Sequence, residues 1–182
     1  RPIPKPEDFK NIKFRAMGSL QASMFKALGA SAVPIPWPET YTSLQTGVVD
    51  GQTNAAFVVS VFKMYEVQKY ISLANSQFGY QIWLCNKAWY DGLSSADKGI
   101  LRDAVKAGRM STRSMALLRE QESLTQLAKD GMKITALTGE EVSALQKLAG
   151  PVCLEWLKKQ MEPKWVDDMV KAVADAEKKL GY

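Results

Sequence analysis

The chain has 182 residues, of which 46% are hydrophobic and 24% charged, and this predicts one domain, alone or with an appendage, rather than two full domains. Histidine is absent, which excludes the usual serine and cysteine triads, histidine general bases and most zinc sites. The net charge of +5 is spread over mixed-sign faces, so we expect no nucleic-acid binding. No apolar run is long enough to cross a bilayer, and because the chain opens at Arg1 without Met we expect a cut N-terminus.

The first half of the chain alternates strand and helix patterns. Alternating apolar residues precede Gly18-Ser19, which offers a helix start, and Gly29 supplies a stop. Pro38 and Glu39 open a second helix. The expected elements are a strand over 12–17, a helix over 19–28, an extended edge segment over 32–36, a helix from 38 to 47, a strand or strand-like loop over 52–56, a helix over 60–70, and a buried strand over 78–86.

The second half is helical. Ser94 and Asp97 form a capping-box pattern, and no proline interrupts the sequence from there to Gly131, so we expect a helix of ~35 residues and ~50 Å. A helix of that length is longer than one small lobe is wide, so we expect it to cross more than one lobe. A short strand over 132–135, a helix capped by Thr138 and Glu141, and a last helix over 164–180 complete the expected elements.

No residue set invites a catalytic mechanism. Glu39 suits the first turn of a helix and Asp50 suits a turn before a glycine, so both have structural explanations. Cys85 and Cys153 lie in apolar surroundings, which predicts two buried thiols rather than a disulfide. We therefore expect no enzyme activity, no metal and no cofactor.

Two residues are candidates for ligand binding. Arg15 lies near the end of a strand that is otherwise buried, and a permanently charged guanidinium there needs an anion, either an internal Asp or Glu or the carboxylate of a ligand. Trp37, between Pro36 and Pro38, either presents its indole to a cleft or plugs the core. The residues alone leave both alternatives open.

Several motifs occur in a characteristic order. Lys13-Phe14-Arg15 and Ala27-Leu28-Gly29-Ala30 precede the stretch Leu-Gln-Thr-Gly-Val-Val-Asp-Gly-Gln at residues 44–52, and Asn86-Lys87-Ala88-Trp89 follows it. This order resembles the solute-binding proteins of tripartite ATP-independent periplasmic (TRAP) transporters, the DctP-type family, over essentially the whole chain. The resemblance implies an α/β fold, the second lobe of a type II-like periplasmic binding protein with a long connecting helix and C-terminal helices.

The resemblance also implies a ligand site. Arg15 matches the strand arginine that pairs with the carboxylate of the bound organic acid in this family. Asn54 matches an asparagine that hydrogen-bonds the ligand, and Trp37 matches an aromatic position that packs on it. Phe57 and Tyr80 are the remaining expected ligand-binding residues.

Three positions depart from the family pattern. Thr53 replaces a glutamate, Ala55 replaces a proline, and Ser76 stands where many relatives have histidine. These departures leave the identity of the organic acid open.

The function implied by the resemblance is transport without catalysis. The expected role is a periplasmic component that captures a small carboxylate ligand and delivers it to the membrane subunits of a TRAP transporter.

We expect residues 1–92 to form the ligand-binding lobe, and residues 93–182 to form the long lobe-spanning helix, a short strand and C-terminal helices that pack on it. The resemblance also implies that the first lobe of the family is missing from this sequence. We therefore expect either a truncated fragment, or a chain that pairs with another copy as a homodimer or with another polypeptide such as a separate N-terminal lobe. The alternative is a truncated or dimeric interaction or sensory domain of the same fold without transport activity.

Overall fold

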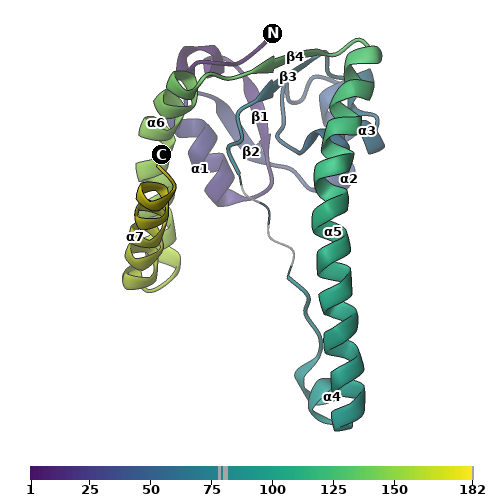
Figure 1. The fold of residues 1–182 in the computed structure, drawn as a ribbon. Helices are drawn as coiled ribbons and strands as arrows, with labels where there is room; N and C mark the ends of the chain where they lie inside the picture. Colours follow the sequence, from purple (N-terminus) through teal and green to yellow (C-terminus); the bar gives the residue numbers. More distant parts are fainter. Residues whose placement is uncertain (78, 80–81, 182) are drawn as a thin grey trace.

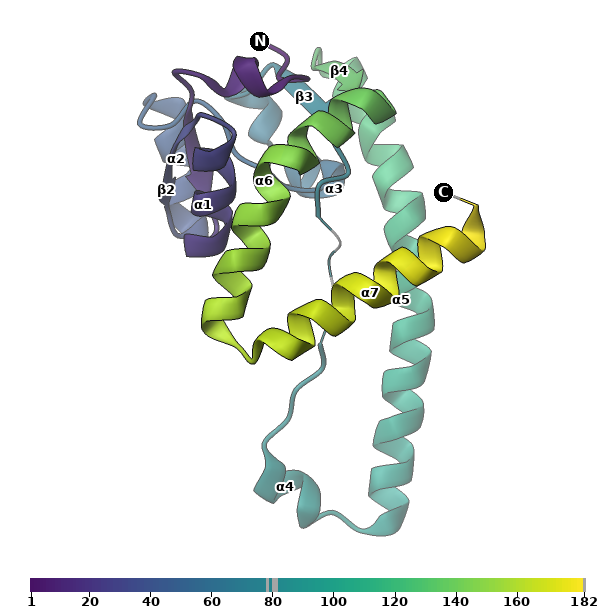
Figure 2. The same cartoon turned by 90° about the vertical axis from the view of Figure 1, so that its left-hand side faces the viewer.

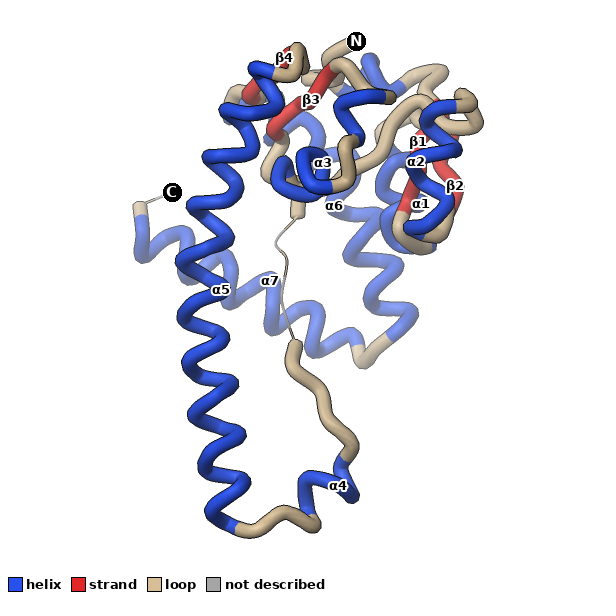
Figure 3. Tube along the Cα trace, turned by 90° about the vertical axis from the view of Figure 1, so that its right-hand side faces the viewer, coloured by secondary structure: helices blue, strands red, loops and turns tan. Residues whose placement is uncertain are grey.

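The computed structural model describes residues 1–77, 79 and 82–181, and Figure 1 shows a small α/β lobe from which one long helix extends. The elements in chain order are η1 (Pro6–Phe9), β1 (Lys13–Ala16), α1 (Ser19–Ala27), β2 (Ser31–Pro34), α2 (Trp37–Gln45), α3 (Ala56–Val61), η2 (Met64–Glu66), β3 (Tyr70–Leu73), α4 (Lys87–Asp91), α5 (Ser95–Lys129), β4 (Lys133–Ala136), α6 (Gly139–Gln160) and α7 (Pro163–Leu180). The strands and most of the short helices gather at one end of the molecule (Figure 3).

The first sheet is the parallel pair β1-β2, in which Phe14 lies opposite Ala32. On the other side of β1, Gly51 makes a parallel bridge with Phe14, and its carbonyl accepts a 2.8 Å hydrogen bond from the Arg15 N–H. A Cβ at position 51 would lie 2.8 Å from the Phe14 ring, so only glycine lets the chain approach this closely. The predicted third strand is therefore a strand-like loop, in contact with β1 at Gly51.

The second sheet is the parallel pair β3-β4, in which Tyr70 lies opposite Lys133. The predicted helix over 60–70 is wrong, because α3 ends at Val61 and β3 begins at Tyr70. Lys63 between them adopts a left-handed conformation with φ of 53°, which a continuous α-helix does not allow. Pairing with a strand some sixty residues away decides the structure here.

Two apolar clusters hold the lobe together. In the first, Phe9, Phe14 and Phe25 pack with ring centroids 4.1–6.1 Å apart, and Ala149 of α6 closes the cluster. The second cluster joins α2, α3 and η2 to the C-terminal part of α5 through Leu127, which is fully buried. The two clusters lie against different helices, so both α5 and α6 are anchored on the same lobe.

The long helix α5 confirms the expected span and cap. The Ser94 side chain accepts a hydrogen bond from the Asp97 N–H, as the capping pattern predicts. Near its C-terminus the helix packs on the lobe, whereas residues 111–119 are all exposed. Figure 1 shows the N-terminal half of the helix running beyond the lobe to α4.

The predicted buried strand over 78–86 is wrong within the described residues. Residues 79 and 82–86 lie outside any strand, and the side chains of Ile82, Trp83 and Leu84 are 75%, 62% and 88% exposed. An apolar run forms a buried strand only where a sheet edge pairs with it, and no strand of the described chain does so. Cys85 is exposed as a consequence, which corrects its expected burial; it and the partly buried Cys153 are both free.

The C-terminal helices confirm the predicted capping box and last helix. Thr138 accepts from the Glu141 N–H while the Glu141 carboxylate accepts from the Thr138 N–H. Helix α6 then packs on α1, and Figure 2 shows the chain turning sharply into α7, which runs back across the molecule. The short strand β4 that precedes α6 was also expected, at residues 132–135.

Candidate functional site

Arg15 is a buried cation at the carboxyl-terminal part of β1. The residue is 4% exposed, and its Nε–H donates a 2.9 Å hydrogen bond to the Ile35 carbonyl, which follows β2. The Nη1 atom is also buried, and within the described residues it has no hydrogen-bond partner. The guanidinium is thus held in place at one nitrogen and unsatisfied at another.

No internal acid compensates Arg15 in the described part of the chain. The ion pairs found there join other residues, all of them on helices α4 to α7. Burial lowers the pKa of the Arg15 guanidinium from its ordinary value, because desolvation disfavours the charged form. An arginine nevertheless stays charged at neutral pH, so its buried nitrogen still favours an anion.

Trp37 lies beside Arg15 at the start of α2. The Arg15 Cζ atom is 5.7 Å from the centroid of the indole ring, within the range of a cation–π contact. The ring of Phe62 meets the indole edge-on, at 88° and 5.0 Å between centroids. The half-buried indole contacts both the Arg15 cation and the Phe62 ring, and it also packs against the second apolar cluster.

Asn54 lies in the loop that follows Gly51 and belongs to a small network of amides. Its Nδ2 donates to Gln52 Oε1 at 2.6 Å, and Gln52 Nε2 donates to Gln68 Oε1 at 3.3 Å. Since Gly51 pairs with β1, the loop leaves the sheet beside the strand that carries Arg15. The amides supply neutral donors and acceptors on the loop that follows Gly51.

Phe57 lies in the first turn of α3 and is 41% exposed. Its N–H and that of Ala56 donate to the two carboxylate oxygens of Glu120, on α5. Sequence reasoning missed Glu120, because a cap supplied from 63 residues away leaves no local pattern. Tyr80, the remaining expected ligand residue, lies outside the described residues.

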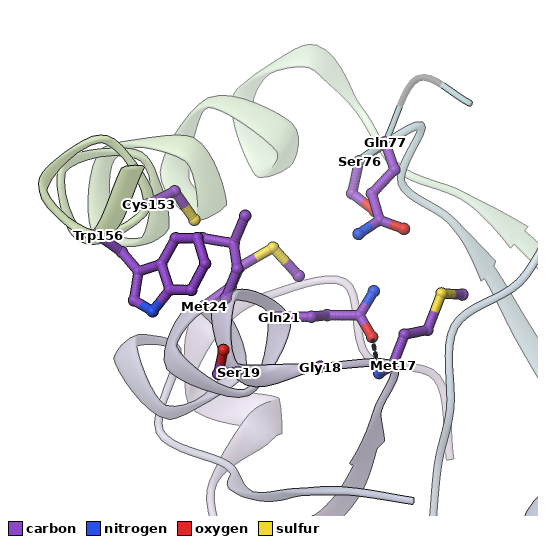
Figure 4. Close-up of a pocket in the computed structure, with 10 residues that line it drawn as sticks. Met17, Gly18, Ser19, Gln21, Met24, Ser76, Gln77, Cys153 and Trp156 are labelled. Carbon is purple, nitrogen blue, oxygen red and sulfur yellow. Dashed lines mark hydrogen bonds between the residues drawn. The ribbon is translucent and has the colours of Figure 1, made fainter. Parts of the chain in front are cut away.

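A pocket that the described residues form lies elsewhere. It measures about 560 Å³ and lies between α1, α6 and the segment before residue 78 (Figure 4). The pocket is lined by Met17, Gly18, Ser19, Leu20, Gln21, Met24, Ser76, Gln77, Cys153 and Trp156. Among these residues, Gln21 is 6% exposed, and its side-chain oxygen accepts a 2.7 Å hydrogen bond from the Met17 N–H.

The lining of this pocket carries no formal charge. None of its residues is an expected ligand residue. We give more weight to the surroundings of Arg15, because a buried unpaired donor is a stronger sign of a polar ligand than an open apolar hollow.

The chemistry available around Arg15 is recognition rather than reaction. In the described ranges, histidine, cysteine, aspartate and glutamate do not gather in groups of three or more that could hold a metal ion. No helix in those ranges is long and apolar enough to span a membrane. A cation, an aromatic ring and amides together can hold a small anionic molecule by charge, stacking and hydrogen bonds.

Comparisons with known proteins identify the family. Residues 1–160 match the family described as bacterial extracellular solute-binding protein, family 7 (DctP). The ectoine-binding periplasmic protein TeaA of Halomonas elongata is 35% identical over 154 residues, covering 83% of this chain and 45% of TeaA. The C4-dicarboxylate-binding periplasmic protein DctP of Rhodobacter capsulatus is 35% identical over 156 residues, with 83% and 46% covered.

A solved structure agrees with the sequence comparison. The periplasmic ectoine-binding protein of the TeaABC TRAP transporter of Halomonas elongata superimposes with a TM-score of 0.84 at 32% identity, covering 96% of this chain and 58% of the other. The chain thus spans about half the length of the relatives it matches. These relatives are periplasmic solute-binding proteins and not enzymes, as expected, and they have the expected fold. The chain belongs to family 7 of the bacterial extracellular solute-binding proteins, the DctP family of TRAP transporters.

Proposed function

We propose that this chain forms the ligand-binding lobe of a TRAP solute-binding protein, which captures a small organic acid through Arg15 and delivers it to the membrane subunits. In this proposal residues 1–92 supply the side chains that touch the ligand, and residues 93–182 support the lobe. The observation that carries the proposal is the buried Nη1 of Arg15, which has no hydrogen-bond partner within the described residues.

The physical argument begins with the cost of burying a charge. A buried guanidinium with an unsatisfied donor is unfavourable unless an anion supplies the missing contact. A carboxylate has two oxygens in the geometry that the guanidinium fork recognises, and such charge-assisted hydrogen bonds are about twice as strong as neutral ones. A small organic acid therefore suits Arg15 better than a neutral ligand does.

The neighbours of Arg15 support the same ligand class. Trp37 can pack on the body of the acid, and the amide of Asn54 can hydrogen-bond its carbonyl or hydroxyl groups. The relatives are named for ectoine and for C4-dicarboxylates, both of which carry a carboxylate. The proposal therefore specifies a carboxylate group in the ligand, and experiment has to identify the rest of the molecule.

The test is a titration of the 15N-labelled chain with succinate and with ectoine, followed by NMR through the Nε–Hε signal of Arg15 in the unaltered chain and through the backbone amide signals in the unaltered chain and every variant. We expect one of the acids to shift the Arg15 signal, and Arg15→Ala to weaken binding roughly 10- to 100-fold, since a hydrogen bond to a charged group contributes ~1.5–3 kcal/mol. Arg15→Lys keeps the charge but loses the fork, so it should also bind weakly.

The matched control is Arg113→Ala, because Arg113 is an exposed arginine in the part of α5 that lies beyond the lobe. This variant should bind like the unaltered chain. Equal affinity in Arg15→Ala and Arg113→Ala, with both folded by circular dichroism, would contradict the assignment of Arg15.

A second candidate function rests on a different observation. Apolar side chains are exposed along α5 and α7, among them Leu117 at 76% and Trp165 at 67%. Such surfaces favour an interaction domain that associates with a second copy or another polypeptide. Association that depends on protein concentration and ignores organic acids would support this candidate.

A further inference from the structure

The side chain of Glu120, on α5, caps the N-terminus of α3, although the two helices are far apart in the sequence. Its Oε1 accepts from the Ala56 N–H at 3.0 Å and its Oε2 accepts from the Phe57 N–H at 3.2 Å. The first N–H groups of a helix have no partners within the helix, and a negative charge at that end is favourable. The N-cap residue Ala55 has no side chain that could do this, so the cap depends on Glu120.

Glu120 also lies at the point where α5 leaves the lobe. Leu124 and Leu127, one and two turns further along the same face, pack in the second apolar cluster. Residues 111–119, which precede Glu120, are all exposed. Within the described residues, α5 makes side-chain hydrogen bonds to residues 1–92 only through Glu120 and through Lys98, and Lys98 donates to the Asp91 carbonyl of α4 at the far end of the helix.

The capped segment carries two of the proposed ligand residues. Phe57 is itself one of the two donors to Glu120, and Asn54 lies two residues before Ala56. The other end of this segment is tied to β1 through Gly51. The segment that carries Asn54 is therefore held at two points, by the pairing of Gly51 with β1 and by the hydrogen bonds to Glu120 on α5.

We propose that Glu120 is a positioning residue, which holds the Asn54–Phe57 segment at the ligand site and makes ligand binding sensitive to the placement of α5. The inference rests on the proposed function, since it concerns the same site. A shift of α5 along α3 would separate the carboxylate from the two N–H groups. The segment would then lose its fixed point on α5 and keep only the one at Gly51.

The experiment compares Glu120→Ala, Glu120→Gln and the control Glu122→Gln in the full chain. Glu122 is an exposed carboxylate two residues away that pairs with Arg119 on the same helix. The dissociation constants for succinate and ectoine are measured by NMR titration at a temperature where all variants are folded. The exchange rates of the Ala56 and Phe57 amide hydrogens are measured in the same samples.

We expect Glu120→Ala to weaken binding about tenfold, because both charge-assisted contacts to the segment are lost. Glu120→Gln keeps one oxygen acceptor and should restore part of the affinity, and Glu122→Gln should change nothing. Both Glu120 variants should speed amide exchange at Ala56 and Phe57 while amides in β1 stay protected. Unchanged affinity in a folded Glu120→Ala variant would overturn the inference.

Failure of the proposed function gives a different pattern. If Arg15→Ala binds the acids as well as the unaltered chain, the carboxylate site is wrong whatever Glu120 does. If Arg15→Ala loses binding and Glu120→Ala does not, Arg15 stands and the positioning role is refuted. If neither acid shifts the Arg15 signal, unchanged exchange at Ala56 and Phe57 and unmoved Asn54 side-chain signals in Glu120→Ala refute the positioning role independently.

Discussion

Arg15 and Glu120 are two charged residues that the fold compensates in opposite ways. Both oxygens of Glu120 accept backbone N–H groups, so its charge is satisfied within the fold. Arg15 is satisfied at Nε by the Ile35 carbonyl and has an unpartnered Nη1 among the described residues. A structural charge is expected to be fully compensated, and an incompletely compensated one is the better candidate for binding a ligand.

Gly51 controls the distance between β1 and the loop that follows Gly51 and carries Asn54. In Gly51→Ala the added methyl group would lie 2.8 Å from the Phe14 ring, and that ring is packed between Phe9 and Phe25. Such overpacking typically costs ~1–3 kcal/mol, so we expect Gly51→Ala to lower the free energy of unfolding by that amount. Urea denaturation followed by circular dichroism measures it.

Gly99→Ala is the matched control for that substitution. Gly99 lies inside α5, and a Cβ there meets nothing within 4 Å. Alanine in a helix interior is more favourable than glycine by ~0.5–1 kcal/mol, so this variant should be slightly stabilised. A Gly51→Ala chain as stable as Gly99→Ala would show that the loop can move away from Phe14 without cost.

At the scale of whole elements, local signals decided what the sequence could predict. The caps at Ser94 and Thr138 are formed by residues three positions apart, and both helices begin where these patterns predict. The sequence pattern does not reveal the strand β3, and it predicts a strand over 78–86 that the described residues 79 and 82–86 do not form, because pairing with a distant segment decides both. The surroundings of Arg15 divide in the same way: Trp37 is a near neighbour of β2, whereas Glu120 comes from a distant helix.

Leu127 anchors α5 to the lobe. Its side chain is fully buried among α3, η2 and Met132, so Leu127→Ala removes apolar contacts and leaves a cavity. Substitutions of this kind cost ~2–5 kcal/mol, and we expect a loss of stability in that range. Leu117→Ala, at a position 76% exposed on the same helix, should change stability by less than about 0.5 kcal/mol.

Thermal or urea unfolding of both variants checks this prediction. Since Leu127 and Glu120 lie on the same face of α5, Leu127→Ala should also speed amide exchange at Ala56 and Phe57. Equal stability of the two leucine variants would mean that α5 is not held by this cluster.

At the scale of the whole molecule, the exposed apolar surface is the main feature left without a partner in the described structure. It includes Ile82, Trp83 and Leu84 before α4, Leu117 on α5, and much of α7. On α7 the residues Val166, Met169, Val173, Ala176 and Leu180 are spaced alternately by three and four, the spacing of a coiled-coil seam. Only Val166 among them is buried, so the seam is open along most of its length.

An open apolar seam predicts association of the isolated chain. Contact between two copies of α7 would remove Met169, Val173 and Leu180 from water, which are 49%, 52% and 72% exposed in the single chain. We therefore expect oligomers in native mass spectrometry and sedimentation at high protein concentration. The same spectra would show any small acid bound to the chain as an added mass.

Val173→Glu places a charge at the centre of this seam and should shift the chain to monomer, because an unpaired charge in an apolar contact is costly. Lys171→Glu lies on the charged side of α7 and changes the net charge by more, so it should leave association unchanged. A chain that stays monomeric over the whole dilution series would contradict the seam as an interface. Oligomers that persist in Val173→Glu would instead place the contact on α5 or on the segment before α4, where the other exposed apolar side chains lie.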